Sequence, residues 1–157
     1  SFPGDKTATY KEGILVGYRW FDTKKIEPLY PFGYGISYTS FNIGNFSANK
    51  KSYNKSETIL IKCTVKNTGK RKGAEVVQVY VSNPGSSVMK ADKELKAFSK
   101  VMLQQGESKV VEMKIKVADL AFYDETKNAW NTEASEYILQ VGNSSRDIFQ
   151  KVKISVK

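Results

Sequence analysis

Carboxylates are the side chains of this sequence best able to do chemistry, because the chain contains no histidine. Without histidine it lacks the commonest general base, the serine–histidine and cysteine–histidine pairs, and a usual ligand of zinc. Paired carboxyl groups could still act as acid and base. The acidic residues that could do so by type are Glu12, Asp22, Glu27, Asp119, Asp124 and Glu125. Asp124 and Glu125 fall in a predicted loop, where a solvated pair is the simpler interpretation.

A second candidate group lies in the aromatic segment between residues 10 and 39. Arg19 could stack on a ring or pair with Glu12 or Asp22, and a buried ion pair there would fix the segment. The aromatic rings could form a sugar-stacking platform, or they could hold this segment against a neighbouring domain. We expect a domain interface or a sugar-facing surface from Glu12, Tyr18, Arg19, Trp20, Phe32, Tyr34 and Tyr38.

Sites for phosphate, metal or redox chemistry are not indicated. Gly33-Tyr-Gly35 is too short for a phosphate-binding loop and is not followed by a predicted helix. Cys63 is the single cysteine and lies in an apolar alternation, which predicts a buried core residue. We therefore expect neither a cofactor nor a metal.

The net charge of +9 is concentrated after residue 42, where the sequence has 20 basic and 12 acidic residues. Many of these lysines alternate with apolar residues, as Lys62, Lys114 and Lys153 do, which is typical of a solvated sheet face. The densest basic cluster, residues 66–72, fits a hairpin loop. The sequence thus favours neither a nucleic-acid partner nor, with no long apolar run, a membrane partner.

From Phe41 onward, apolar residues recur at every second position, which predicts half-buried strands. The expected strands are 41–46, 56–66, 73–81, 93–103, 108–117, 136–142 and 148–156. Strand 73–81 is apolar on both faces, which predicts a central strand covered on both sides, with the N-terminal segment as a candidate cover. The irregular spacing in 93–103 predicts a bulge.

Seven strands with turn signals between them indicate an all-β fold, an immunoglobulin-like seven-stranded β-sandwich. It carries an N-terminal extension rich in aromatic residues, glycine and proline. Within the extension, Gly13 to Phe21 predicts a strand. Residues 119–124 predict a single helical turn, and Trp130 is expected to fill the core or the domain edge.

Two motifs in the extension carry a family resemblance. Residues 10–22 read Tyr-x-Glu-Gly-Ile-x-Val-Gly-Tyr-Arg-x-x-Asp, and residues 27–39 read Glu-Pro-Leu-x-Pro-Phe-Gly-Tyr-Gly-x-Ser-Tyr-Thr. Together with Val76-Val-Gln-Val-Tyr-Val81 and Tyr137-x-x-x-Val-Gly-x-Ser-Ser145, they closely resemble family 3 glycoside hydrolases of the β-glucosidase and β-xylosidase type. One departure is Glu133-Ala-Ser-Glu136, where the family pattern has a Pro-Gly turn.

The resemblance implies that residues 1–40 are the end of a preceding α/β domain and a linker. Residues 41–157 would be a fibronectin type III-like β-sandwich. Both catalytic carboxylates of the family would lie upstream, so no catalytic residue is carried over. The implied partners are upstream catalytic domains of the same polypeptide, and a periplasmic or secreted location is plausible by the same resemblance.

Three functions remain open from the sequence. The chain could be a non-catalytic C-terminal domain that packs on and stabilises the catalytic domains of an enzyme that hydrolyses terminal β-linked sugars. It could instead be an independent carbohydrate- or surface-binding module. A free-standing adhesion-type sandwich explains the extension less well. Burial of Trp20, Phe32 and Tyr34 on a neighbouring domain would favour the first.

Overall fold

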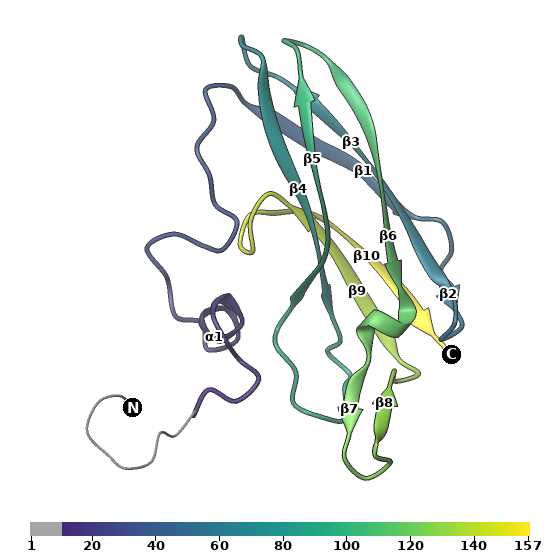
Figure 1. Ribbon diagram of the computed structural model, residues 1–157. Coiled ribbons are helices and arrows are strands. Elements are labelled where there is room, and N and C mark those ends of the chain that lie inside the picture. The colour runs from purple at the N-terminus through teal and green to yellow at the C-terminus, as the bar shows by residue number, and fades with distance from the viewer. Residues whose placement is uncertain (1–10) are drawn as a thin grey trace, which may run out of the picture.

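The computed structural model describes residues 11–157 and shows a β-sandwich with an extension along one side (Figure 1). Residues 1–10, the start of the predicted extension, lie outside the described residues. One sheet has the order β1-β3-β6, formed by β1 (Phe41–Ala48), β3 (Thr58–Asn67) and β6 (Ser108–Lys116). The other has the order β2-β10-β9-β4-β5, formed by β2 (Ser52–Tyr53), β10 (Ile148–Val156), β9 (Glu136–Gly142), β4 (Gly73–Ser82) and β5 (Glu94–Leu103).

The core lies between the two sheets and follows the period-two pattern. In β3, alternate side chains point inward and are almost fully buried: Ile59, Ile61, Cys63 and Val65. Burial raises the pKa of the Cys63 thiol to about 11, so this thiol stays protonated at neutral pH. The prediction of a buried core cysteine is confirmed.

A buried tyrosine at the start of β9 ties the second sheet to the loop before it. The hydroxyl of Tyr137 donates to the backbone carbonyl of Glu133, four residues upstream, at 3.1 Å. This arrangement is the tyrosine corner of immunoglobulin-like sandwiches. Geometry therefore supports the predicted sandwich class independently of any family resemblance.

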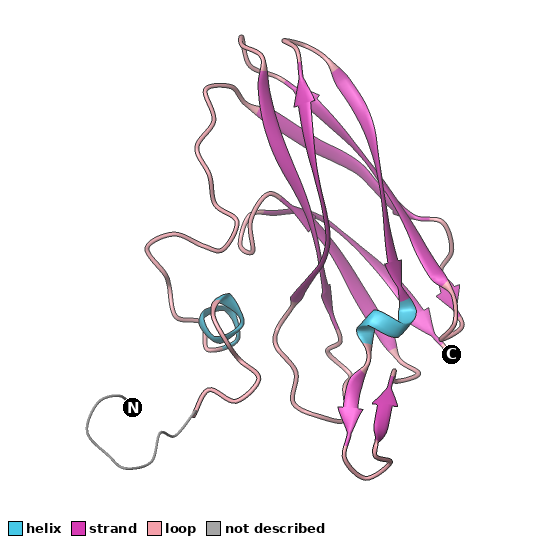
Figure 2. Ribbon diagram, in the orientation of Figure 1, coloured by secondary structure: helices cyan, strands magenta, loops and turns pink. Residues whose placement is uncertain are grey.

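All seven predicted strands are present, and most regular structure is strand (Figure 2). The register of β4 against β5 shifts between Val79 and Tyr80, which confirms the predicted irregularity in strand 93–103. Three short strands were not predicted: β2 and the hairpin of β7 (Phe122–Asp124) and β8 (Ala129–Asn131). A helical turn was predicted at residues 119–124. The structure has a 3-10 turn, η1 (Val117–Leu120), which overlaps only the first two of these residues.

The prediction that Trp130 fills the core is wrong, whereas its alternative place at the domain edge stays a prediction. Its side chain lies on β8 and is 73% exposed. The indole contacts the ring of Tyr123 edge-on across the hairpin, with the ring centroids 5.8 Å apart. The polar residues around Trp130, such as Asn128 and Asn131, belong to a hairpin that projects beyond the end of the sandwich, so the indole has no core to enter.

The predicted strand from Gly13 to Phe21 is also wrong, because the chain forms α1 (Tyr18–Thr23) there instead. Gly13 and Gly17 both have positive φ, which ends any extended run before the aromatic residues. A strand needs a partner in a sheet, and no described strand pairs with this segment. No helix among residues 11–157 has the length and apolarity needed to span a membrane.

The contrast between two side chains tests this assignment of the core. Leu139 is fully buried on β9, so Leu139→Ala should lower the free energy of unfolding by about 2–5 kcal/mol. Trp130→Ala should lower it by less than about 1 kcal/mol, because the indole is exposed. Urea unfolding of both variants measures the difference, and equal losses would place the indole in the core after all.

Candidate domain interface

The extension is held against the outer face of the five-stranded sheet by aromatic and polar contacts that begin at α1. Tyr18 stacks on Phe32 with ring centroids 4.5 Å apart, and its ring meets the edge of the fully buried Tyr80 on β4. The Tyr18 hydroxyl accepts a hydrogen bond from the backbone N–H of Leu95 at 2.8 Å. Burial raises the pKa of Tyr18. The neutral phenol is therefore the form that holds α1 to the sheet.

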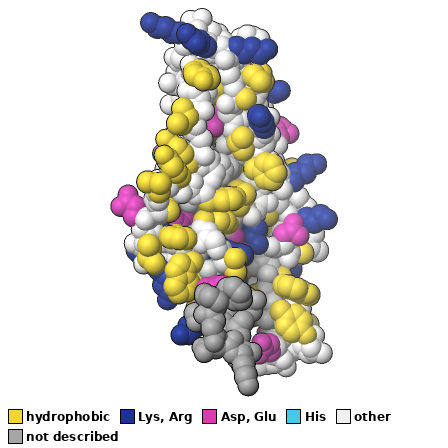
Figure 3. All heavy atoms as spheres, turned by 60° about the vertical axis from the view of Figure 1, so that its left-hand side comes forward, with side chains coloured by type: hydrophobic (Ala, Val, Ile, Leu, Met, Phe, Trp, Pro, Cys, Tyr) yellow, Lys and Arg dark blue, Asp and Glu magenta, His cyan; other side chains and the backbone are white. Residues whose placement is uncertain are grey.

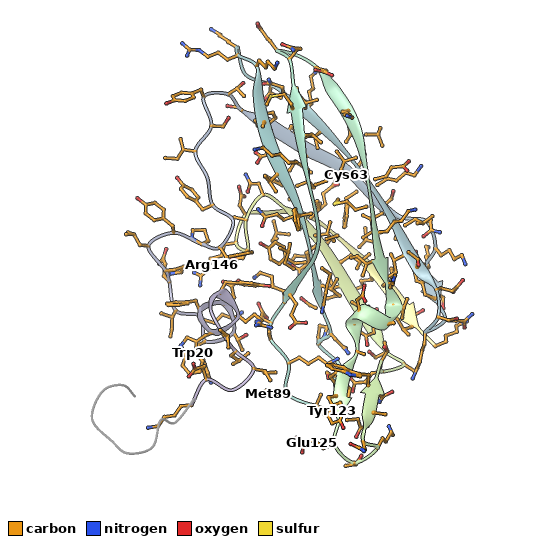
Figure 4. All side chains as sticks on the ribbon, viewed as in Figure 1. Trp20, Cys63, Met89, Tyr123, Glu125 and Arg146 are labelled. Atoms are coloured by element: carbon orange, nitrogen blue, oxygen red, sulfur yellow. The ribbon has the colours of Figure 1, made fainter. Side chains whose placement is uncertain are left out.

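Asp22, one helical turn after Tyr18, forms a buried ion cluster with the sandwich. Its side chain is 2% exposed, and its carboxylate accepts from Arg146 Nε at 2.9 Å and lies 3.3 Å from Lys93 Nζ. A second nitrogen of Arg146 donates to the backbone carbonyls of Phe21 and Ile26. Figure 4 shows Arg146 between the extension and the sandwich. Arg146, in the β9–β10 turn, thus binds both α1 and the residues that follow it.

The next contact is a close approach between Gly33 and β4. Gln78 is buried, and its amide donates to the carbonyls of Asn143 and Gly33, while Tyr80 donates to its side-chain oxygen. Gly33 has φ +83°, and a Cβ there would lie 2.4 Å from the Gln78 side chain. Only glycine therefore fits. The predicted covering of strand 73–81 on both sides is confirmed, with the extension as the outer cover.

The extension ends in a third contact, at the turn between β3 and β4. The hydroxyl of Thr39 donates to Asn67 Oδ1 at 2.7 Å, and the carbonyl of Ser40 accepts from the N–H groups of Thr68 and Gly69. Asn67 is fully buried and donates to the carbonyls of Arg71 and Leu103. The described part of the extension is thus held to the sandwich at α1, at Gly33 and at Thr39 and Ser40.

The side chains that point away from these contacts are mostly apolar and lie in solvent. Leu29 is 89% exposed, Ile36 is 86% exposed and Tyr38 is 91% exposed. Figure 3 shows hydrophobic side chains along much of this side of the molecule. A groove of about 530 Å³ lies between the extension and the sandwich and is lined in part by Tyr34, Ile36 and Arg146. Soluble proteins rarely leave so many large apolar side chains free, so this surface fits an interface.

The prediction that Arg19 pairs with Glu12 or Asp22 is wrong. Arg19 lies 3.2 Å from Glu94 at the start of β5, and both side chains are about one third exposed. Burial pushes the pKa of Glu94 up, but Lys96 and Arg19 together hold it below its ordinary value. The ion pair does fix α1 to the sandwich, through a partner 75 residues away. Asp22 takes the buried position instead, because it lies on the inward face of α1 with Tyr18.

The other predicted residues lie along the same surface without forming one compact site. Glu12 and Trp20 line an open pocket of about 310 Å³ at the α1 end, and Lys24 lies over the indole at 5.3 Å. Phe32 stacks on Tyr18, and its backbone carbonyl accepts from the N–H of Ser145 at 2.8 Å. Tyr34 instead stacks on the exposed Tyr30. Tyr38 projects into solvent at the far end. The arrangement fits an extended interface better than a small pocket.

Among residues 11–157 the carboxylates that could do chemistry by type form no metal site. No cluster of three or more candidate ligands occurs there. Asp124 closes the β7–β8 turn, where its carboxylate accepts from the N–H and hydroxyl of Thr126 and from the N–H of Lys127. The hydrogen bonds from Thr126 and Lys127 hold the pKa of Asp124 at about 2. The turn uses this carboxylate structurally.

Three residues that carry the interface were not singled out as candidates: Arg146, Lys93 and Gln78. Gln78 had a signal, because it is the polar residue in an otherwise apolar strand. Arg146 and Lys93 had none, since a basic residue in a turn or beside a strand is common on any surface. Their role depends on a contact with Asp22, which lies 124 residues before Arg146.

Replacing the buried carboxylate tests the docking of the extension. Asp22→Asn removes the charge that Arg146 and Lys93 share, at a cost of about 3 kcal/mol for a broken buried pair. That cost should speed amide hydrogen exchange in residues 18–26 roughly 100-fold, because the extension opens more often. Asp119→Asn, at an exposed carboxylate, is the matched control and should change nothing. Unchanged exchange in Asp22→Asn would show that the cluster does not hold the extension.

Comparisons with known proteins agree with this architecture. A fibronectin type III-like domain model matches residues 75–145. The chain is 45% identical over 157 residues to thermostable beta-glucosidase B of Acetivibrio thermocellus, covering 99% of this chain and 21% of that protein. It is 39% identical to an exo-alpha-(1->6)-L-arabinopyranosidase of Bifidobacterium breve, covering 100% of this chain and 20% of the relative.

Solved structures show the same relation. The structure of DesR, a beta-glucosidase from Streptomyces venezuelae in complex with D-glucose, superposes with a TM-score of 0.91 at 38% identity and covers all of this chain but 20% of that one. The chain thus spans about a fifth of the length of the relatives that it matches. Because the likeness includes the extension as well as the sandwich, the chain belongs with the C-terminal region of family 3 glycoside hydrolases of the β-glucosidase type, with its fibronectin type III-like domain.

Proposed function

We propose that this chain is a non-catalytic docking unit of a longer glycoside hydrolase, and that its extension packs against the preceding catalytic domains of the same polypeptide. The observation that carries the proposal is the orientation of the extension. Polar groups such as Asp22 and the backbone of Gly33 face the sandwich, while Leu29, Ile36 and Tyr38 face away from it. This arrangement fits a segment that is buried from both sides.

The energetics of burial support the same conclusion. Removing a large aliphatic or aromatic side chain from water contributes roughly 1.5–3 kcal/mol. A neighbouring domain that covers several such side chains would therefore be stabilised together with the sandwich. The groove beside Tyr34 and Ile36 leaves room for side chains of that neighbour. We infer that the unit stabilises the enzyme, which would hydrolyse terminal β-linked sugars with retention of configuration, without a cofactor.

A carbohydrate-binding module is the second candidate, because Tyr30 and Tyr34 stack on one another and both are exposed. The neighbouring residues weaken it. Leu29 and Ile36 present aliphatic side chains with no hydrogen-bonding group, and a sugar would leave its hydroxyls unpaired there. Saturable binding of the chain to a polysaccharide, lost in Tyr34→Ala, would favour this candidate over the docking unit.

Catalysis is expected to reside outside this chain. The purified chain should release no nitrophenol from aryl β-glucosides, since the family resemblance puts both catalytic carboxylates upstream of this chain. The control is a polypeptide that also contains the preceding domains and is assayed at the same molar concentration. Turnover that co-purifies with the chain alone would contradict the proposal.

A second test addresses the interface itself. In the longer polypeptide, Trp20→Ala should lower the melting temperature more than it alters the pH profile of activity, because Trp20 would pack between domains. Val110→Ala, at an exposed apolar residue on β6 in the opposite sheet, is the control and should leave the melting temperature nearly unchanged. A shifted pH profile at an unchanged melting temperature would instead assign Trp20 to the substrate site.

A further inference from the structure

A second group of exposed apolar side chains lies at the end of the sandwich, apart from the extension. It consists of Val88 and Met89 in the loop between β4 and β5, with Tyr123 and Trp130 on the β7–β8 hairpin. We call these four residues the end patch. Met89 is 65% exposed, and the other three are also exposed. None of them belongs to the extension surface described above.

The loop of the end patch is fixed by Glu133, the first residue of the stretch Glu133-Ala-Ser-Glu136 in which this sequence departs from the family pattern. The Glu133 carboxylate accepts from the Ser86 hydroxyl at 2.6 Å, from the Ser87 N–H at 2.7 Å and from the Asn83 amide at 3.1 Å. It also lies 3.2 Å from Lys90 Nζ. Burial alone would raise the pKa of Glu133, but the bonds from Ser86 and Ser87, with Lys90, lower it to about 2. Glu133 is therefore charged, and it holds the loop, at any ordinary pH.

The other end of the loop is bound to α1. The N–H of Asp92 donates to the Thr23 hydroxyl at 2.9 Å, and the Asp92 carboxylate accepts from Lys25 at 3.1 Å. The next residue, Lys93, reaches the buried Asp22. The loop thus connects the hairpin base to α1 through contacts at both of its ends. This connection fixes the position of Met89 between the two elements.

The hairpin itself holds its aromatic residues in a defined arrangement. The ring of Trp130 meets that of Tyr123 edge-on, and Asp124 closes the turn between their strands. Lys90 lies over the ring of Phe122 at 4.9 Å, which joins the hairpin to the loop. Large aromatic side chains that are ordered and exposed lose little entropy on binding, and such residues carry much of the energy of protein interfaces.

We propose that the end patch is a second docking surface for the preceding domain of the same polypeptide. The proposal rests on the function proposed above. Figure 4 shows Trp20, Met89 and Tyr123 toward the same end of the molecule. A domain that covers Trp20 on α1 would reach the loop that is bound to α1, and the hairpin beyond it. The relatives supply such a partner, because about four fifths of their length lies outside the matched region.

Covalent footprinting of the longer polypeptide and of this chain tests the proposal. A photoactivated carbene should label Met89 and Trp130 several-fold less in the longer polypeptide than in the chain alone. Residues 29–38 serve as the internal reference for the extension surface, and Val110 on β6 serves as the unprotected control. Protection of residues 29–38 without protection of Met89 and Trp130 would overturn the end patch while leaving the proposed function intact. Protection of neither surface would overturn both.

Variants test whether the end patch binds a second copy of the chain or a sugar instead of the preceding domain. The unaltered chain and its Trp130→Ser variant should both be monomeric and should not bind soluble β-glucan, and in the longer polypeptide Trp130→Ser should increase labelling of Met89. Glu133→Gln should increase Met89 labelling in the same way, because the loop that carries Met89 loosens while the four side chains of the end patch keep their identity. If the chain forms concentration-dependent dimers that Trp130→Ser abolishes, the end patch binds a second copy of the chain. If the chain binds β-glucan and Trp130→Ser abolishes this binding, the end patch binds a sugar. Either result would overturn the proposal.

Discussion

The buried contact of Asp22 with Arg146 and Lys93 determines how the extension is arranged on the sandwich. A carboxylate at 2% exposure is costly to bury unless cations are fixed beside it, and both cations come from the sandwich. The contact therefore sets where α1 lies, and Gly33 and Thr39 continue the attachment. Because the polar groups of the extension contact the sandwich, many of its apolar side chains face solvent. The proposed interface is a consequence of this division.

The sandwich could be predicted from the sequence because its signal is local. One face of β3 is buried, so apolar and polar side chains alternate along it. Ile59, Ile61 and Cys63 therefore predict the strand from the local sequence alone. The same reasoning was wrong for residues 13–21, where apolar residues on both sides of Gly17 look like a strand. There the backbone at Gly17 and the absence of a pairing strand among the described residues decide for a helix.

The candidate interface was predictable as a region but not in its contacts. Aromatic density marked the extension, and the family motifs marked the same residues. Which charges pair depends on contacts across long sequence separations, such as Asp22 with Arg146 and Glu133 with Ser86. A lysine or an arginine in a turn looks the same in the sequence whether it binds a buried carboxylate or only water. Trp130 was misplaced for the same reason, since aromatic character alone does not reveal whether a hairpin projects from the fold.

The close fit of Gly33 on Gln78 has a consequence for how this region can be moved between proteins. β4 is buried on both faces, and its outer face is covered by the extension rather than by another sheet. A sandwich cut at residue 41 would keep all its strands yet present Gln78 and Tyr80 to water. The portable module is therefore longer than the sandwich, and a chimaera that borrows it would have to inherit the extension as part of its fold.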